Sequence, residues 1–570
     1  MKALYLFLLA LPIFVFGYRF YAKYLVLSTH PLDDETATPA HQDRPNSEYS
    51  PAPKALLYAH HLASISGGTT IIGVTLAVAW GWIPAFLWIV TGTVIAAGVY
   101  GLSMMWWSLQ HEGADPAGLG GALLGTTTQH GIRLLGIGLL VMLMGLLALI
   151  IGQLLDRYPT MVLAFWLQIP LALGLAAVWR RHPRTGLWLL LPMPLLLLAA
   201  VIGADILPLD IGGAVNLKFA DLTLLRIDAT FIWIALVLVY GALATRAPVE
   251  TCARPRSAMA TCLAVIMVLA IIIASTIDLT PVVAPTFNTE ALNLGITPWL
   301  FILLSGGALA GYHGLIASGS TLRQLDRQSD ARAIGYGGAL GDGLIALSVL
   351  VVCSAGYANL DAWQQSYAGW DALNHPGDVL NQFLQALANL LAVFGLRPGT
   401  SQPMAALVLA SLALATIETG LRVLRQLLAP GLSTLPIRRL QKPGQQAWLA
   451  AGLVGLLAVA DGAGSGALGL WPVMLSANQI FAGLMLIMIW LYLRRGAKPT
   501  LAVGLPLGLI LITANWALIT QFIGWFETRS WIRLGVAGLL LGFELWVMIT
   551  VAIRYKSLCG MNDDTKVEAQ

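Results

Sequence analysis

The stretch YHGLIASGSTLRQLDRQSDARAIGYGGALGD, residues 312–342, decides how the rest of this sequence is interpreted. It begins in an apolar run that carries His313, passes through the small polar residues 318–321, and turns at a basic segment. The next apolar run carries a carboxylate, Asp342. Polar groups at the depth of a lipid bilayer are costly, so they mark a functional site by default. The stretch therefore predicts a membrane protein with a polar site among its helices.

The composition of the whole chain also indicates an integral membrane protein. Its 570 residues are 58% hydrophobic and 11% charged, and the mean hydropathy is +0.77. Soluble domains carry about 25% charged residues. The net charge of +4 is spread over many loops, and no nucleic-acid partner is expected. The four cysteines form no CxxC or metal-binding spacing, so we expect free thiols and no metal.

Runs of about 20 apolar residues are long enough to span a bilayer as helices. We therefore expect an all-α, polytopic fold of about fifteen transmembrane helices, with a further partial element at 379–395. Residues 1–556 would form a single transmembrane domain, and 557–570 a disordered cytoplasmic tail. The expected helices are 3–20, 58–78, 83–107, 131–155, 160–179, 186–203, 229–246, 258–278, 298–322, 334–354, 403–421, 446–461, 470–493, 500–523 and 531–553.

The positive charges indicate how the helices are oriented. Loops rich in arginine and lysine stay in the cytoplasm. Such loops alternate with connections that carry few or no positive charges, and this pattern places the N-terminus outside and the C-terminus in the cytoplasm. The basic loops are 19–54, 180–184, 246–256, 323–332, 422–442, 494–498 and 554–556.

A second polar run opens the helix expected at 58–78. Two adjacent histidines, His60 and His61, precede a run of serine, glycine and threonine that begins about 14 Å into the bilayer. Transporters often break helices at such points and expose the half-helix ends to substrate. Small residues that let two helices pack closely would give the same run. Because packing does not need paired histidines, we favour a substrate site at His61, Ser66, Gly67 and Thr69.

His61 and His313 begin the same local pattern: serine five positions later, then glycine, then threonine two further on. Their helices would run in opposite directions, as an inverted repeat requires. The depths differ, however, at about 6 Å from the cytoplasmic side for His61 and about 22 Å from the outer side for His313. A repeat and a chance pattern both stay open. We expect a second wall of the substrate site, or an inner gate, at His313, Ser318, Gly319 and Thr321.

Two carboxylates are candidates for ion coupling. Asp342 lies about 12 Å into its helix, where it either pairs with a histidine or arginine or carries a proton, since a desolvated carboxylate is readily protonated. Glu418 is a weaker candidate, because Arg422 at i+4 is a natural partner for an interfacial salt bridge.

Two amides, Asn478 and Gln479, lie about 12 Å into the helix expected at 470–493. Amides in lipid must form hydrogen bonds, either across helices or to a substrate. Both interpretations are open.

These motifs resemble, in the same order, those of the carbon starvation protein A (CstA) family. The resemblance spans nearly the whole chain. It implies an inner-membrane secondary transporter of the broken-helix, inverted-repeat (LeuT/APC-like) kind. It also implies import of a peptide or a pyruvate-like carboxylate, coupled to a proton or another cation. The matching segments are GYRFYAKYL (17–25), TPAHQDRPNSEYSP (38–51), AHHLASISGG (59–68), GYHGLIASGSTLRQL (311–325), IGYGGALGD (334–342), TIETGLRVLR (416–425) and LWPVMLSANQIFAG (470–483).

The sequence also departs from the family pattern. Gly101 and Ser257 stand where the family has aspartates, the run after the double histidine has lost its prolines, and Asp342 and Glu418 each replace the other acid. The two lost carboxylates keep a second class open, a transport-inactive membrane sensor or regulatory homologue. An enzyme has little support, because no nucleophile or metal-ligand motif lies in the expected helices. No cofactor is expected.

Overall fold

The computed structural model describes residues 1–42, 48–182, 186, 188–204, 209–219, 222–277, 279–288, 295–367, 376–460 and 466–564. Within these ranges, 11 helices are long and apolar enough to cross a membrane, or up to 12 if one bent pair is a single span. This confirms the all-α, polytopic fold. The count of about fifteen was approximate: the remaining three expected helices are shorter or broken.

The N-terminal half contains most of the outer helices and one hairpin. Its elements are α1 (Leu4–Phe16), α2 (Ala22–Ser28), α3 (Lys54–Ile65), α4 (Gly68–Ala77), α5 (Trp82–Gly92), α6 (Gly98–Leu109), α7 (Pro116–Leu124), α8 (Thr126–Arg157), α9 (Pro159–Arg181), α11 (Pro192–Gly203), β1 (Val215–Phe219), β2 (Leu222–Ile227), α12 (Ala229–Arg246) and α13 (Ala253–Ile277). The π-helical turns Gly17–Tyr21 and Thr93–Ala97 join α1 to α2 and α5 to α6.

The C-terminal half contains the second broken helix and the long central helices. Its elements are α14 (Ile296–Leu304), α15 (Gly311–Ile316), α16 (Gly337–Ala355), α17 (Leu360–Ser366), α18 (Pro376–Leu391), α19 (Pro398–Ser433), α20 (Pro443–Ala458), α21 (Trp471–Arg495), α22 (Leu501–Glu527) and α23 (Trp531–Asp564). α18 occupies the position of the partial element expected at 379–395.

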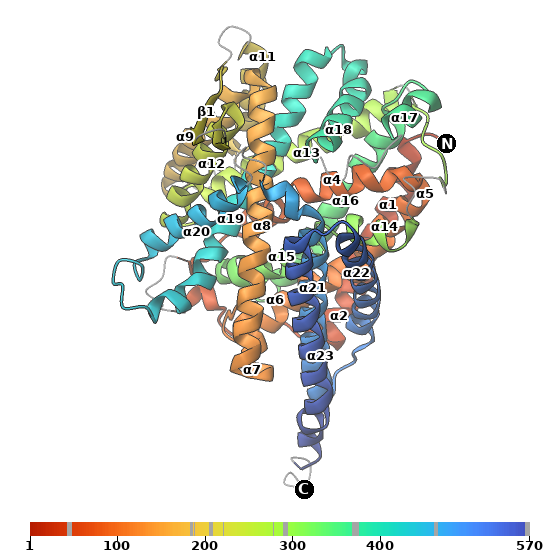
Figure 1. Cartoon of the computed structure of the whole chain (residues 1–570). Helices are drawn as coiled ribbons and strands as arrows, with labels where there is room; N and C mark the ends of the chain where they lie inside the picture. The colour runs from red at the N-terminus through yellow and green to blue at the C-terminus, as the bar shows by residue number, and fades with distance from the viewer. Residues whose placement is uncertain are drawn as a thin grey trace.

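The centre of the bundle is formed by α8, α19 and α21. α8 runs as one long helix from the level of α7 to the level of α11 in Figure 1, and it packs along α19. The most apolar windows of α19 and α21 are each 94% buried, whereas that of α23 is only 22% buried. α23 exposes large apolar side chains such as Leu539 and Ile553. Such exposure suits a helix that faces lipid, so α23 lies at the periphery of the bundle.

Two features were not expected from the sequence. β1 and β2 form an antiparallel hairpin in which Val215 lies opposite Ile227, and Asp228 then caps α12 by accepting a hydrogen bond from the Phe231 amide. At the other end of the chain, α23 continues to Asp564, past the expected start of the tail at residue 557. The last six residues of that tail lie outside the described residues.

A polar site between two broken helices

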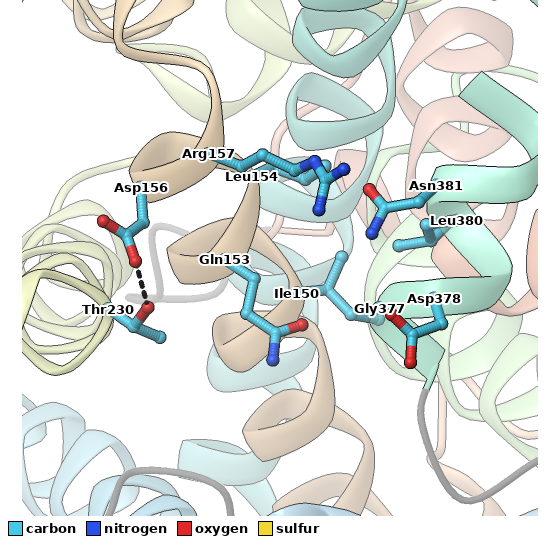
Figure 2. Close-up of a pocket in the computed structure, with 10 residues that line it drawn as sticks. All are labelled: Ile150, Gln153, Leu154, Asp156, Arg157, Thr230, Gly377, Asp378, Leu380 and Asn381. Carbon is cyan, nitrogen blue, oxygen red and sulfur yellow. Dashed lines mark hydrogen bonds between the residues drawn. The ribbon is translucent and has the colours of Figure 1, made fainter. Parts of the chain in front are cut away.

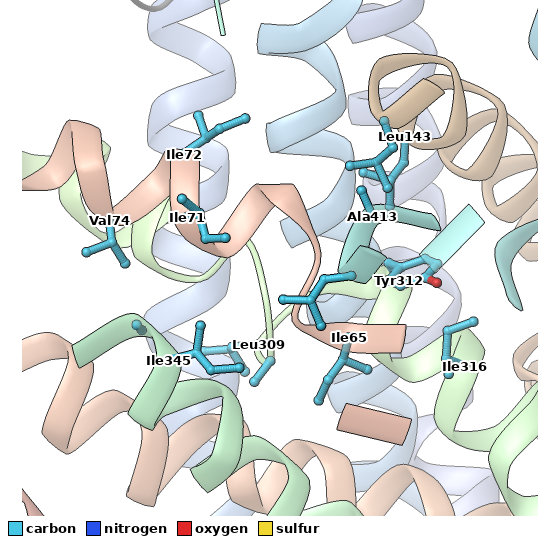
Figure 3. Close-up of a cluster of buried hydrophobic side chains, with 14 of the residues drawn as sticks. Ile65, Ile71, Ile72, Val74, Leu143, Leu309, Tyr312, Ile316, Ile345 and Ala413 are labelled. Carbon is cyan, nitrogen blue, oxygen red and sulfur yellow. The ribbon is translucent and has the colours of Figure 1, made fainter. Parts of the chain in front are cut away.

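The first break separates α3 from α4 at Ser66 and Gly67, within the run of serine, glycine and threonine that predicts it. The two helices meet at a bend of 54°. Gly67 lies against α19, and a Cβ atom at this position would come within 2.7 Å of the Thr416 hydroxyl, so only glycine fits. Apolar side chains enclose the break, with Ile65 on one side and Ile71 on the other (Figure 3). The chain therefore turns inside a closely packed core.

The second break lies at residues 305–310, between α14 and α15, and corrects the expectation that the helix loosens at 318–321. A Cβ atom on Gly307 would lie 2.2 Å from the Thr70 hydroxyl, so the chain passes close to α4 only because glycine is there. Residues 317–321 form a π-helical turn that continues α15. The Ser318 hydroxyl donates to the Gly314 carbonyl at 2.7 Å, and this local bond lets a polar sequence stay helical.

The two histidines of the matching patterns contact each other directly. His61 Nε2 and His313 Nε2 are 3.2 Å apart, and both side chains are fully buried. His61 Nδ1 lies 2.9 Å from the Thr321 hydroxyl, and His313 Nδ1 lies 2.5 Å from the Ala308 carbonyl.

When both rings are neutral, these contacts determine which nitrogens carry hydrogen. A carbonyl oxygen only accepts, so His313 Nδ1 carries a hydrogen and His313 Nε2 accepts when the ring is neutral. His61 Nε2 must then donate, and His61 Nδ1 accepts from Thr321. The result is a directed chain of hydrogen bonds from Thr321 through His61 and His313 to Ala308. The pair is consistent with two neutral rings that share one proton between their facing nitrogens.

Asp342 joins the two breaks. Its carboxylate accepts from the Thr70 hydroxyl at 2.9 Å and from the Ala308 amide at 2.9 Å. Thr70 belongs to α4, and Ala308 lies in the second break. Because the Ala308 carbonyl accepts from His313, the carboxylate and the histidine pair are connected through this one residue. A cavity of about 20 Å³ adjoins Asp342, which is room for about one water molecule.

The two amides on α21 form hydrogen bonds with the backbone at the second break. Asn478 accepts from the Tyr312 amide at 2.9 Å, and Gln479 donates to the Ser305 carbonyl at 3.0 Å. These are cross-helix bonds, one of the two interpretations that the sequence left open. They satisfy backbone groups that the interrupted helix cannot pair internally. A contact of either amide with substrate stays a prediction.

Glu418 belongs to a different network, and the prediction that it pairs with Arg422 was wrong. Arg256 on α13 binds both of its oxygens, with Nε at 2.7 Å and Nη2 at 2.8 Å, and the Tyr240 hydroxyl also donates to it. Arg422 instead binds Glu48 at 3.0 Å. A fully buried carboxylate needs the two parallel bonds of a guanidinium fork, and Arg256 provides them from a neighbouring helix.

The other expected site residues are buried but lie at different places. Ser66 lies in the first break and Thr69 in the first turn of α4, and the Thr69 backbone lies beside Gly306 of the second break. Gly319 lies against α19, where a Cβ atom would be 3.6 Å from the Val423 side chain, an ordinary packing distance. The roles of Thr70 and Ala308 were not expected from the sequence. The run Ser305-Gly306-Gly307, small residues in an apolar segment, was the available signal.

Gly101, where the resemblance to the family implies an aspartate, lies directly against the ring of His313. A Cβ atom on Gly101 would come within 2.7 Å of the His313 ring and 2.5 Å of the Gly335 carbonyl. The space that an acidic side chain would need is therefore filled in this chain.

A separate polar cavity of about 430 Å³ lies at the end of α8 and the beginnings of α12 and α18 (Figure 2). The Thr230 hydroxyl donates to Asp156 at 2.9 Å, and the Arg157 and Asp378 side chains line the same space. None of the expected site residues lines this cavity.

The model of the family described as carbon starvation protein CstA matches residues 2–366 and 358–517. This chain belongs to the CstA family. The peptide transporter CstA of Campylobacter jejuni is 28% identical over 360 residues, covering 61% of this chain and 50% of the relative. The pyruvate/proton symporter BtsT of Escherichia coli is 28% identical over 368 residues, covering 62% and 49%. The chain thus spans about half the length of the curated relatives it matches.

Among solved structures, MhsT in complex with L-phenylalanine is similar to this CstA family member with a TM-score of 0.48 and 12% identity. The match covers 87% of this chain and 99% of MhsT.

Three of the segments that resemble the CstA family meet at the site. AHHLASISGG provides His61 and the first break, GYHGLIASGSTLRQL provides His313 and Thr321, and LWPVMLSANQIFAG provides the amides on α21. A fourth, IGYGGALGD, ends at Asp342. Segments far apart in the sequence therefore form one polar cluster in the core.

Proposed function

We propose that this CstA family member is a secondary transporter that imports a small organic nutrient by alternating access, coupled to a proton or another cation. The observation that carries the proposal is the junction of two broken helices by Asp342 and by the His61–His313 pair. The names of the relatives, a peptide transporter and a pyruvate/proton symporter, support a peptide or a pyruvate-like carboxylate as substrate. We place the protein in the bacterial inner membrane, with its N-terminus outside and its C-terminus in the cytoplasm.

The substrate would bind where the two histidines now touch. α4 begins at Gly68 without a side-chain cap, and a helix N-terminus favours an anion such as a carboxylate. The histidines must separate to admit a substrate, which would expose the groups of both breaks. The residues proposed to line the opened site are His61, Ser66, Gly67, Thr69, His313, Ser318, Gly319, Thr321, Asn478 and Gln479.

Asp342 would carry the coupling proton. As a carboxylate it holds the Ala308 amide with a charge-assisted bond, which is roughly twice as strong as a neutral one. Protonation removes that charge and weakens the hold on the second break, while the Thr70 hydroxyl can reverse and accept. Glu418, the other proposed coupling group, has both of its oxygens bound by Arg256. Asp342 is therefore the better proton carrier.

The deciding experiment is uptake of labelled pyruvate and of labelled dialanine into proteoliposomes, with and without an inward proton gradient. Asp342→Asn keeps the side-chain shape and acceptor oxygen, so the variant should fold. The rate of its gradient-driven uptake should fall at least about tenfold. The variant should still exchange substrate across the membrane without a gradient. Asp361→Asn, at an exposed position of α17, is the matched control. Full gradient-driven uptake by Asp342→Asn would disprove the coupling role.

The filled space at Gly101 favours one other function, a sensor that binds the nutrient without moving it. Calorimetric binding of pyruvate or dialanine without flux of either compound in the same proteoliposomes would support this alternative.

A further inference from the structure

A groove on the outside of the bundle lies away from the polar site. It has a volume of about 850 Å³ and runs between α1, the start of α3 and the start of α16. Asp342 and the histidine pair do not line it. Its walls are mainly apolar, and the long apolar side chains that form them are Leu11, Phe14, Val15, Leu340 and Leu344.

Positive charges gather at one end of this groove. Arg19 follows α1, Lys54 begins α3, and Arg332 begins the π-helical turn Arg332–Tyr336 before α16. Arg19 is exposed. Lys54 binds Asp330 at 3.0 Å, with half of its side chain still exposed at 53%. Three cations face one carboxylate, so this end of the groove attracts anions.

Contacts with Tyr18 hold Arg332 in place, but they do not use all of its hydrogen-bond donors. Its Nη2 donates to the Tyr18 carbonyl at 2.7 Å, and its guanidinium lies 4.7 Å above the Tyr18 ring. Its Nε atom is buried and has no hydrogen-bond partner among the described residues. The two contacts with Tyr18 therefore hold the positive charge of Arg332 at the wall of the groove.

The dimensions of the groove suit one leaflet of a bilayer. From the basic end, the apolar wall extends along α1 to Leu11 and along α16 to Leu344, or about 12 and 18 Å at 1.5 Å per residue. Half of a bilayer's hydrocarbon core is about 15 Å. At this wall Gly341 lets α3 approach α16 closely, because a Cβ atom on Gly341 would come within 2.6 Å of the Tyr58 hydroxyl.

We propose that this groove binds one anionic phospholipid. The phosphate lies between Arg19 and Lys54, beside the Arg332 guanidinium, and one acyl chain lies along the apolar walls. Basic pockets beside transmembrane helices recognise anionic head groups in this way. A free phosphate ion would leave the apolar walls uncovered, so the lipid is the better occupant. This inference does not depend on the proposed transport function.

The test is titration of the delipidated full-length chain with phosphatidylglycerol and with phosphatidylcholine, followed by native mass spectrometry. We expect one phosphatidylglycerol per chain, bound at least about tenfold more tightly than phosphatidylcholine. Each cation contributes about fivefold to the affinity for an anionic lipid. The double variant Arg19→Gln with Lys54→Gln should therefore bind phosphatidylglycerol about 25-fold more weakly and phosphatidylcholine with unchanged affinity. Arg438→Gln, at an exposed arginine after α19, is the control and should bind as the parent does.

A second variant tests the apolar part. Leu340→Trp fills the groove without changing its charge and should abolish binding of phosphatidylglycerol, while an unchanged melting temperature shows that the variant folds. Equal affinity for the two lipids, full binding by the double variant, or full binding by Leu340→Trp would each overturn the proposal. So would displacement of the lipid by inorganic phosphate alone, or a dimer that fills the groove with a second copy of the chain.

Discussion

The Nε2 atoms of His61 and His313 lie 3.2 Å apart, although 252 positions separate the two residues in the sequence. The neutral rings share one hydrogen at this contact, because His313 Nδ1 donates to Ala308 and His61 Nδ1 accepts from Thr321. A second proton would place two N–H donors face to face. The contact can therefore form with one shared proton and is disfavoured with two.

The histidine pair should be essential for transport. Phenylalanine fills the space of either ring but breaks the chain of hydrogen bonds, so His61→Phe and His313→Phe should each reduce uptake at least about tenfold. His60→Phe is the matched control. His60 is also buried on α3, but its ring nitrogens have no hydrogen-bond partner among the described residues. Labelled-substrate uptake in proteoliposomes checks this, and equal losses in all three variants would mean that packing alone matters.

The Arg256–Glu418 pair should behave as a buried ion pair. Glu418→Gln leaves the Arg256 guanidinium buried without a counter-charge and should lower the free energy of unfolding by about 3–5 kcal/mol. The double variant Arg256→Met with Glu418→Leu removes both charges and should recover much of that loss. Unfolding in a denaturant-detergent titration measures both. Additive losses in the double variant would show that the two charges do not stabilise each other.

Introducing at position 101 the aspartate that the resemblance implies should harm this chain. The Cβ atom of any side chain there would lie 2.7 Å from the His313 ring and 2.5 Å from the Gly335 carbonyl. Gly101→Ala and Gly101→Asp should therefore both lower the melting temperature and uptake, with aspartate the worse. Gly138→Ala on α8 is the control, since a Cβ atom there has no neighbour within 4 Å. Gain of uptake in Gly101→Asp would refute this reasoning.

His30, in the connection after α2, should make the protein sensitive to acid. Its ring lies between the Thr29 and Ser103 hydroxyls at 2.6 and 2.9 Å. Burial, with a smaller effect from the charge of Lys498, lowers the pKa of His30 to about 3. The unfolded chain binds a proton here below about pH 6.5. The native state does not, so this group lowers stability as the pH falls from about 6.5 towards 3, by about 1.4 kcal/mol per pH unit.

Melting temperatures measured against pH test this contribution. As the pH falls, the melting temperature of His30→Gln should decrease less steeply than that of the parent chain. His182→Gln, at an exposed position, should follow the parent. An unchanged slope in His30→Gln would show that the ring is protonated in the native state.

Local sequence predicted the features that depend on neighbouring residues. The thickness of a bilayer sets the length of an apolar run, so α5 with α6, α8 and α21 lie close to their predicted spans. The break at Ser66 and Gly67 was visible because small and polar residues interrupt an apolar helix there. The same reasoning placed the second break at 318–321 and failed, because serine can bond to the preceding turn and remain helical.

The sequence by itself determined that this chain is a polytopic helical protein of the CstA pattern with histidines, amides and carboxylates inside its helices. Only the tertiary structure decided which of these groups meet. Glu418 pairs with Arg256, 162 positions away, and not with Arg422 one turn along its own helix. Asp342 joins Thr70 to Ala308 across two helix breaks. The physical reason is that a buried polar group takes the partner with the best geometry, and helix packing decides which distant side chains come within reach.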